Sequence, residues 1–371
     1  MGTAAIVGGG IGGLAVAAAL VRRGWDVRVY EQAPGFTEVG AGISMWANAL
    51  SALDAIGVGD EVRAAGAHPG RGGFRDRRGR WLARGAGAAD ELVMLHRADL
   101  LAILRAAVPA ECLVAGRRVE DPRVTGGRAV VEGTPVDLLV GADGLRSRVR
   151  QVFWPDAAAP RYAGYTAWRF VLPHAGVPRF DGSETWGGGL VFGAFPMGRG
   201  MSTDHIYCYA AARSPEDARV PDELTELRRR FAGWPDPIPA LLAAADPAAV
   251  LRHDLGYLPD LPSFTAGPVA LVGDAAHAMT PNLGQGACQA LEDAVTLAAL
   301  VDEPDGLARY DALRRPRAQA IARRSRQVAA MAHLSWGPAA ALRNLAVRLT
   351  PDSAARRQLQ SVAGWRAPSP G

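Results

Sequence analysis

The chain has 371 residues, 49% of them hydrophobic and 21% charged, which is the ordinary balance of a soluble globular protein large enough for two domains. All 41 basic residues are arginines and the formal net charge is only +4, so charge gives no support for a nucleic-acid partner. The absence of lysine also excludes Schiff-base catalysis and the lysine of a phosphate-binding P-loop.

The N-terminal segment predicts a strand–helix–strand unit. A short apolar strand at 4–7 runs into glycines, an Ala/Leu-rich helix follows at 11–22, and a second strand at 27–30 ends at Glu31. A Gly-rich loop then leads into a helix near 48–56. This order is typical of the first half of a doubly wound α/β domain.

The middle of the chain alternates between two kinds of structure. Residues 70–95 contain a hairpin pattern, and a helix is expected from about Arg97. The buried run "VDLLVGADG" breaks at Asp143 and Gly144 and turns into a helix. From 162 to 212, aromatic and β-branched residues cluster between Gly and Pro breaks, which predicts an antiparallel sheet.

The C-terminal part is expected to be mostly helical. Two helices are predicted within 221–245, and a buried strand, "VALVG", ends at Asp274 before a Gly-rich loop and further helical sequence. No signal peptide, membrane helix or cysteine cluster is recognisable, and the three cysteines are far apart. We therefore expect a reduced, cytoplasmic protein without a metal site.

The glycine motif Gly8-x-Gly10-x-x-Gly13 lies directly between the first strand and the first helix. In such a motif the first glycine permits a tight turn, the second lets the backbone approach a pyrophosphate, and the third lets the helix pack closely on the strand. Glu31 can accept hydrogen bonds from a ribose diol and would repel a 2′-phosphate. The motif therefore predicts a bound dinucleotide other than NADP.

Two aspartates follow other strands in a similar way. Asp143 and Asp274 each stand where a buried strand ends and a helix begins, so each is either a helix cap or a ligand for a polyol chain. Doubly wound sheets bind their ligands outside the carboxyl ends of the strands. Three such strand ends in one chain therefore indicate one extended dinucleotide, held by segments far apart in the sequence.

Together these motifs resemble those of the group A FAD-dependent aromatic monooxygenases, which have the p-hydroxybenzoate hydroxylase fold. The resemblance rests on "GGGIGG" with Glu31, "HRADLL", "GADGLRSRVR" and "VGDAAHAMTPNLGQGACQALEDA", and it covers residues 4 to about 330. "EVGAGI", "GYTAWR" and "TPNLGQGA" are most similar to the salicylate hydroxylase-like and zeaxanthin epoxidase-like branch, which includes 6-hydroxynicotinate and urate hydroxylases. Val191 stands about where the urate hydroxylases carry an arginine, which argues against urate.

The resemblance implies an α/β fold, in which a Rossmann-like FAD-binding domain carries an inserted antiparallel-sheet substrate domain and C-terminal helices. We expect the discontinuous FAD-binding domain at 1–75, 96–155 and 265–330, the substrate domain at 76–95 and 156–264, and a helical segment at 331–371.

The resemblance also assigns the residues around FAD. The ADP half would be held by the glycine motif and Glu31, the ribityl chain by Asp274, and the pyrophosphate region by Arg97 and Asp143. Pro281 would lie beside the isoalloxazine and the substrate. The backbone at the pyrimidine edge would come from Leu283, Gly284, Gln285 and Gly286. Donors at a helix N-terminus there would stabilise the anionic reduced ring.

The antiparallel sheet would cover the flavin and supply the substrate pocket. Arg169, His205 and Tyr207 are the candidate catalytic residues, although Arg169 also fits a scaffold salt bridge and His205 a surface position. The candidate pocket residues are aromatic, with packing within the sheet as the alternative for half or more of them: Trp46, Trp168, Trp186, Phe192, Phe195 and Tyr209. His205, Tyr207 and Tyr209 share one face of a strand, and either this face or that of Ile206 and Cys208 points at the flavin.

The expected activity follows from the resemblance. NADH or NADPH would reduce FAD, and O₂ would then form a flavin C4a-hydroperoxide that transfers one oxygen atom to an aromatic or heteroaromatic small molecule in a dry pocket. The alternative is an epoxidase or another flavin oxidoreductase of the same fold that acts on a secondary metabolite. We expect a monomer or homodimer, with no nucleic acid or membrane as a partner.

Overall fold

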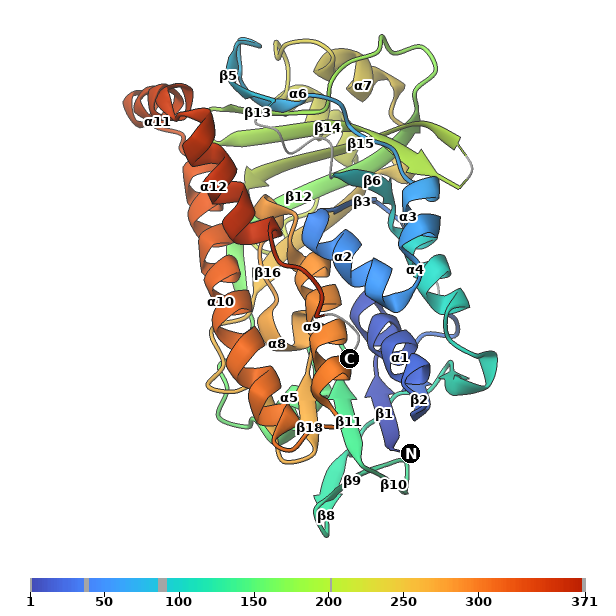
Figure 1. Ribbon diagram of the computed structural model, residues 1–371. Coiled ribbons are helices and arrows are strands. Elements are labelled where there is room, and N and C mark those ends of the chain that lie inside the picture. Colours follow the sequence, from blue (N-terminus) through green and yellow to red (C-terminus); the bar gives the residue numbers. More distant parts are fainter. Residues whose placement is uncertain (1, 37–39, 86–91, 201, 369–371) are drawn as a thin grey trace.

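The computed structural model describes residues 2–36, 40–85, 92–200 and 202–368. Glu38 and Val39 of the "EVGAGI" motif lie outside the described residues, as does part of the stretch 70–95. The described chain forms two large sheets, one above the other in Figure 1, with helices packed around them. The predicted fold class, a Rossmann-like α/β part combined with an antiparallel sheet and C-terminal helices, is confirmed.

The lower sheet in Figure 1 is the Rossmann-like part, with the strand order β17-β18-β11-β1-β2-β7. Its strands pair in parallel, except that β17 and β18 are antiparallel. Its strands are β1 (Thr3–Val7), β2 (Asp26–Tyr30), β7 (Leu113–Val114), β11 (Leu138–Gly141), β17 (Thr265–Ala266) and β18 (Val269–Leu271). A small sheet projects below it and consists of β8 (Arg123–Thr125), β9 (Arg128–Val131) and β10 (Thr134–Val136).

Helix α1 (Ile11–Arg22) has the bounds that the sequence predicts. It is rich in Ala and Leu, which have high helix propensity, and the chain turns just after it at Gly24, whose φ of 79° favours glycine. Nine of its residues are buried, because it packs both on the sheet and against α9. Its burial on several sides explains why it lacks the polar face of a surface helix.

The other helices surround the two sheets (Figure 1). They are α2 (Ala47–Ile56), α3 (Gly59–Ala65), α4 (Arg97–Ala106), α5 (Arg148–Phe153), α6 (Glu223–Arg230), α7 (Ile238–Ala244), α8 (Asp274–His277), α9 (Gly286–Leu300), α10 (Gly306–Ala332), α11 (Gly337–Leu349) and α12 (Asp352–Ala363). The long helix α10 runs beside both sheets and so connects the lower part of the molecule with the upper part.

The upper sheet follows the order β16-β12-β15-β14-β13-β4-β5, and β6 joins it through β14 while pairing with β3. Its strands are β3 (Gly42–Met45), β4 (Gly73–Asp76), β5 (Trp81–Arg84), β6 (Val93–His96), β12 (Arg161–Pro173), β13 (Ser183–Gly187), β14 (Leu190–Arg199), β15 (Ser202–Arg213) and β16 (Leu251–Tyr257). The predicted hairpin is β4–β5, and the predicted domain boundary between residues 75 and 76 falls inside β4.

The two faces of the upper sheet bury different clusters. On one face, Trp168 and Cys208 belong to a cluster that includes the apolar side chains of α6 and α7. On the other face, one cluster around Tyr165 includes residues of α10 and α11, and a second around Tyr207 includes residues of β6. The second face is therefore the one turned toward the lower sheet, and only its side chains can contact a ligand bound between the sheets.

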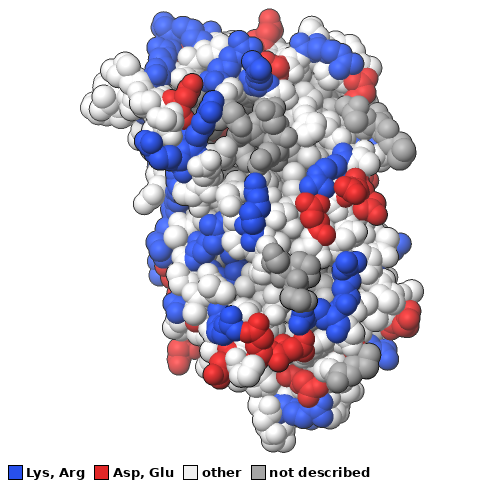
Figure 2. All heavy atoms as spheres, viewed as in Figure 1, with Lys and Arg blue, Asp and Glu red and all other residues white. Residues whose placement is uncertain are grey.

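The face of the molecule drawn in Figure 2 shows no single extended basic stripe. Figure 2 shows Arg side chains spread over one face of the molecule with acidic side chains among them. In the described part of the chain, no helix combines the length and the apolar character that crossing a membrane requires.

Candidate active site

The carboxyl ends of four neighbouring strands bring together the residues predicted to hold a dinucleotide. The strands are β18, β11, β1 and β2, in that order across the lower sheet. Asp274 follows β18, Asp143 follows β11, the glycine motif follows β1, and Glu31 follows β2. Because parallel strands present these ends at one edge, a single extended ligand can contact all four segments.

The three glycines of the motif have different structural roles. A Cβ on Gly8, whose φ is 108°, would lie 2.3 Å from the carbonyl oxygen of Ala142, and a Cβ on Gly13 would lie 1.9 Å from that of Gly8. Both positions require glycine, because the backbones approach too closely for a side chain. A Cβ on Gly10 would meet no described atom within 4 Å, so the N-terminus of α1 is open toward an anionic ligand.

Glu31 and Asp143 are held by backbone N–H groups. The carboxylate of Glu31 accepts hydrogen bonds from the N–H of Gly9 and of Ala33, both at 2.8 Å. One oxygen of Asp143 accepts from the backbone at the start of α5, at 2.6 Å and 3.1 Å. The other oxygen, Oδ1, is buried without a partner in the described residues. Asp143 therefore caps α5 and still presents an acceptor that a ligand can satisfy.

Asp274 differs from Asp143 because it caps nothing. Gly273, with a φ of 58°, occupies the N-cap position of α8, and Asp274 is the first helical residue. Its exposed carboxylate makes no hydrogen bond or ion pair with another described residue. The helix-cap alternative is therefore wrong for Asp274, and its charge remains available to a ligand.

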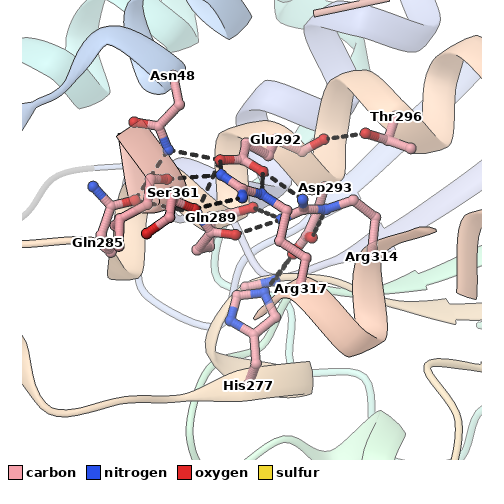
Figure 3. A network of polar contacts seen from close by, with 12 residues as sticks. Asn48, His277, Gln285, Gln289, Glu292, Asp293, Thr296, Arg314, Arg317 and Ser361 are labelled. Atoms are coloured by element: carbon pink, nitrogen blue, oxygen red, sulfur yellow. Dashed lines mark hydrogen bonds and ion pairs between the residues drawn. The ribbon is translucent and has the colours of Figure 1, made fainter. Parts of the chain in front are cut away.

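A buried polar network fixes the turn that carries Asp274 (Figure 3). One oxygen of Asp293, on α9, accepts from the N–H of Gly273 at 2.9 Å and from Nε2–H of His277 at 2.6 Å. Burial alone would raise the pKa of Asp293, but the neighbouring charges of His277 and Arg314 outweigh it and lower the pKa to about 2. His277 thus has a structural role in this turn.

The same network joins three helices. Arg314, on α10, pairs with both Asp293 and Glu292 of α9 and is 1% exposed, while Glu292 is fully buried. Asn48, on α2, donates to Glu292 at 2.6 Å and to Oε1 of Gln285 at 3.0 Å. These bonds hold the beginning of α9, where the predicted pyrimidine-edge backbone lies (Figure 3).

The loop before α9 packs against β3 and α2. Pro281–Leu283 forms a short 3₁₀ turn, and Gly284 follows it with a φ of 61°. A Cβ on Gly284 would lie 2.7 Å from Oγ of Ser44 and 3.1 Å from Nε1 of Trp46. A Cβ on Gly286, by contrast, would meet no described atom within 4 Å. The loop is therefore tightly packed on the side of Trp46 and open at the N-terminus of α9.

The face of β15 that carries Tyr207 and Tyr209 points toward this loop. Tyr207 lies in the cluster that Trp46 and Phe195 contact, and a Cβ on Gly42 of β3 would lie 2.3 Å from its ring. Tyr209 stacks on Phe195 with ring centroids 6.0 Å apart. Of the two orientations left open by the sequence, the one with this aromatic face inward is therefore present.

Two predicted pocket residues lie on the face of the upper sheet that is covered by α6 and α7, away from the site. Trp168 donates from Nε1 to Glu223 at 2.7 Å, in the cluster with α6 and α7. Phe192 belongs to the same cluster and packs on Phe231 with ring centroids 5.2 Å apart. Because neighbouring residues of a strand alternate between faces, their neighbours Arg169 and Gly193 face the site instead. Trp168 and Phe192 are therefore withdrawn as pocket residues.

The remaining predicted residues lie around the aromatic face. Arg169 is opposite Tyr209 in the β12–β15 pairing and has no ion-pair partner among the described residues, so the scaffold salt bridge is absent there. Burial raises the pKa of Tyr207, whereas the charges of Arg169 and Arg97 act in the opposite direction. His205 is half-buried, with Nδ1 buried and without a partner in the described chain.

Glu184 is a site residue that the sequence reasoning missed. It lies on β13, half-buried, and accepts hydrogen bonds from Tyr209 O–H and from Nε1–H of Trp186. Burial raises the pKa of Glu184 above its ordinary value, although these two hydrogen bonds act in the opposite direction. Burial and then the Glu184 carboxyl raise the pKa of Tyr209 well above its ordinary value. A lone glutamate in a strand carries no signal that distinguishes it from a solvated one.

Replacing Asp274 with Ala is expected to weaken FAD binding by roughly one to two decades, since it removes one charge-assisted hydrogen bond to the ribityl chain. The expectation rests on the free carboxylate at the end of β18. Equilibrium titration of the FAD-free protein, followed by flavin fluorescence, measures the change.

Asp26→Ala is the matched control, because Asp26 is an exposed carboxylate at the amino end of β2, on the opposite edge of the lower sheet from Asp274. It should leave FAD affinity unchanged. Equal affinity of wild type and a folded Asp274→Ala protein would contradict the role assigned to Asp274.

Comparisons with known proteins agree with this geometry at both ends of the site. The N-terminal residues 6–37 match the family model described as an NAD(P)-binding Rossmann-like domain, and residues 260–325 match the model described as an FAD binding domain. The first match contains the glycine motif and Glu31, and the second contains Asp274 and the loop before α9.

Similar proteins cover nearly the whole chain. Aurachin C monooxygenase/isomerase of Stigmatella aurantiaca is 41% identical, over 85% of this chain and 86% of that protein. 6-Hydroxynicotinate 3-monooxygenase of Bordetella bronchiseptica is 33% identical, over 81% of this chain and 82% of that protein. The structure of Klebsiella pneumoniae HpxO complexed with FAD and uric acid has a TM-score of 0.86 at 27% identity, and covers 98% of this chain and 96% of that one.

Proposed function

Because this chain belongs to the family of FAD-dependent aromatic monooxygenases, we propose that it hydroxylates an electron-rich heteroaromatic or phenolic ring held between Trp46 and the aromatic face of β15. The observation that carries the proposal is the inward orientation of Tyr207 and Tyr209, with Arg169 beside them and Glu184 behind. A planar ring fits against such aromatic walls, and the few polar atoms orient it.

The type of reaction follows from the family. The protein is an FAD-dependent, NAD(P)H-consuming monooxygenase, as the sequence predicts. When bound, FAD accepts electrons from NAD(P)H and activates O₂. In this chain, Asp274 and the N-termini of α1 and α9 would hold it, since the Asp274 carboxylate has no described partner and no described atom lies within 4 Å of a Cβ at Gly10 or Gly286. Glu31 would add an acceptor beside the two backbone N–H groups that it already binds.

The side chains of β14 bear on the class of substrate. The residues of this strand that face the site are Val191, Gly193, Phe195 and Met197, none of which is polar. Polar recognition must therefore come from β12 and β15, through Arg169, His205 and the tyrosines. Relatives at 33–41% identity are named for hydroxynicotinate, quinolone and aurachin chemistry, which supports an oxygen-bearing nitrogen heterocycle. The apolar β14 wall does not favour urate.

Tyr209 and Glu184 supply the proton chemistry that such a ring needs. Tyr209 donates its own proton to Glu184, so its oxygen is free to accept a hydrogen bond from a substrate hydroxyl. Transfer of the substrate proton to Tyr209, with the tyrosine proton moving to Glu184, leaves a ring oxyanion and a neutral carboxyl group. The oxyanion makes the ring more electron-rich and prepares it for electrophilic oxygen transfer.

A screen of NAD(P)H oxidation tests the proposed function. Purified holoprotein is mixed with hydroxynicotinate, 4-quinolones, aminohydroxybenzoate and urate, and the products are analysed by mass spectrometry. We expect stimulation by oxygen-bearing heterocycles and a product one oxygen atom heavier. Substrate-dependent oxidation without gain of oxygen would instead favour the alternative, a flavin oxidoreductase of another type.

Tyr207→Phe and His205→Ala are expected to increase uncoupling, so that more NAD(P)H is consumed per product formed and more H₂O₂ is released. The reason is that both side chains lie on the aromatic face of β15 and would hold the substrate oxygen. Product and H₂O₂ are quantified per NAD(P)H consumed, together with FAD content, which should not change.

Cys208→Ala provides the comparison, because Cys208 lies between the two tyrosines on β15 but faces α6 and α7. Its coupling should match that of wild type. Wild-type coupling in both Tyr207→Phe and His205→Ala would move the substrate site toward Arg169 and Trp46.

In this proposal, the two sheets have separate roles, one in binding FAD and the other in binding the substrate. FAD would be bound by the segments 1–75, 96–155 and 265–330, and the substrate would be covered by 76–95 and 156–264, with 331–371 as a helical segment along both. The cytoplasmic location and the monomeric or dimeric state remain predictions.

A further inference from the structure

A cavity lies apart from the aromatic face of β15. Its volume is about 320 Å³, and it lies between the start of β12, the ends of β15 and β16, and helix α10. None of the candidate catalytic or pocket residues lines it. A volume at the lower end of the small-molecule range suits a compound with one or two rings.

An irregularity in the sheet forms the cavity wall. The pairing of β12 with β16 shifts register between Tyr162 and Thr166, so the intervening residues bulge out of the ladder. Gly164 within this bulge has a φ of 84°, and a Cβ there would meet nothing within 4 Å. Small residues of α10, Ala329 and Ala330, face the bulge. Bulges often occur next to functional sites, where they redirect side chains.

Two arginines give the cavity a positive charge without an internal counter-charge. Arg326, on α10, has Nη1 buried without a partner, and its guanidinium lies over the ring of Tyr257 at 4.7 Å from the centroid. Arg213, at the end of β15, lines the cavity but is exposed, and it makes no ion pair with another described residue. Most buried polar groups have partners, so the buried Nη1 of Arg326 calls for an acceptor, and the charge of the second arginine favours an anionic one.

His333 adds an acceptor to the same cavity. Its Nδ1–H donates to the carbonyl oxygen of Gly189 at 2.9 Å, and Nε2 is buried without a partner in the described residues. Burial lowers the pKa of His333, and Arg213 adds to this effect, while the bond to Gly189 acts in the opposite direction. The neutral ring therefore keeps Nε2 as an acceptor, and the ring of Tyr165 lies 4.6 Å away.

We propose that this cavity binds a small hydroxylated aromatic carboxylate, at a site separate from the substrate face. The carboxylate would pair with Arg326 and Arg213, the ring would lie against Tyr257 and Tyr165, and the hydroxyl would donate to His333 Nε2. The site adjoins the FAD loop, because Tyr165 O–H donates to Asn282 at 2.8 Å. Its occupant would thus lie one side chain away from the loop that contains Pro281.

The test measures binding to the oxidised holoprotein without NAD(P)H, so it does not depend on turnover. Calorimetric titration with 4-hydroxybenzoate is compared with the neutral amide, 4-hydroxybenzamide. We expect the acid to bind and Arg326→Leu to weaken it by roughly tenfold or more, since one charge-assisted pair is lost. Ala330→Trp, which fills the cavity without removing a charge, should abolish binding.

Arg323→Leu is the control, because Arg323 lies on the same helix but pairs with Asp260 at the surface. It should bind like wild type. Soaking crystals with 3-bromo-4-hydroxybenzoate locates the ring through the bromine. Absence of binding to wild type, unchanged affinity in both Arg326→Leu and Ala330→Trp, or bromine only beside Tyr207 would each overturn the proposal. None of these results would contradict the proposed function, which is tested by product formation.

Discussion

Replacing Arg314 with Met is expected to lower the free energy of unfolding by about 3–5 kcal/mol. Arg314 is 1% exposed and pairs with Glu292 and Asp293, whose side chains are fully buried. Methionine keeps the apolar stem but leaves both carboxylates without this counter-charge, and an uncompensated buried charge is strongly destabilising. Arg317 still pairs with Glu292 at 2.7 Å, so Asp293 should account for most of the loss. Urea denaturation of the FAD-free protein measures the difference.

Arg323→Met tests whether burial causes the effect. Arg323 lies on the same helix and also pairs with an aspartate, Asp260, but the two side chains are 48% and 38% exposed. Exposed pairs contribute roughly 0–1 kcal/mol, so this variant should be close to wild type. Similar losses in the two variants would contradict the importance assigned to the buried network.

The stability difference should also depend on pH. The pKa of Asp293 is about 2 in the folded protein, below the value near 4 expected for the unfolded chain. A lowered folded pKa stabilises the protein above about pH 4, and this contribution is lost as the pH falls toward 2. In Arg314→Met the pKa of Asp293 should rise, so the gap between the two proteins should narrow below about pH 4.

The FAD end of the site could be predicted because its signals are local. Gly8 and Gly13 are required by backbone geometry within one strand–turn–helix unit, whereas Gly10 leaves the N-terminus of α1 open, as the motif predicts for an approaching ligand. The strand ends at Asp143 and Asp274 are likewise visible as apolar runs that stop abruptly. Strand pairing then brings them together, and parallel α/β topology allows few other arrangements.

The substrate end could be predicted only in part, because it depends on which face of a strand is inward. Alternation shows that Trp168 and Arg169 point in opposite directions, but not which one faces the flavin. That choice is made by α6 and α7, which follow later in the chain and cover Trp168. The inward face of β15 was equally open from the sequence, since Tyr207 and Cys208 both suit a buried position.

The polar network was missed for a related reason. Glu292, Asp293 and Arg314 lie on helices where charged residues usually face solvent, and the sequence contains no sign that two helices enclose them. Glu184 was missed because its partners Trp186 and Tyr209 are recognisable only after β13 and β15 are aligned through β14. Such buried charges require knowledge of tertiary contacts.

Replacing Glu184 with Gln is expected to reduce product formation by roughly 100-fold, the effect typical of losing a general base. Glu184 is proposed to receive the proton that Tyr209 passes on from the substrate, and an amide cannot accept it. Product is measured by chromatography under saturating NAD(P)H, and FAD content is measured in parallel. Gln also leaves one of the two donors, Tyr209 or Trp186, poorly paired, so a stability loss of about 1–3 kcal/mol is expected.

A pH profile separates the proton-transfer role from that structural loss. Because burial raises the pKa of Glu184, the carboxylate is present above this raised value and protonated below it. Wild-type product formation should therefore fall as the pH drops through that pKa. The Gln variant should lack this decrease, and its product formation should rise with pH only as the substrate itself ionises. Tyr209→Phe, which breaks the path between substrate and Glu184, should show the same altered profile.

Glu223→Gln is the matched control for this experiment. Glu223 also accepts from a tryptophan, Trp168, at 2.7 Å, but on the opposite face of the same sheet. It pairs with Arg252 as well, so some loss of stability is expected there too. If stability alone governed the activity, both glutamine variants would lose product formation with an unchanged pH profile, and the proton path through Tyr209 would be refuted. If the path operates, only Glu184→Gln, of the two glutamine variants, removes the decrease in product formation at low pH, and its FAD content stays at the wild-type level.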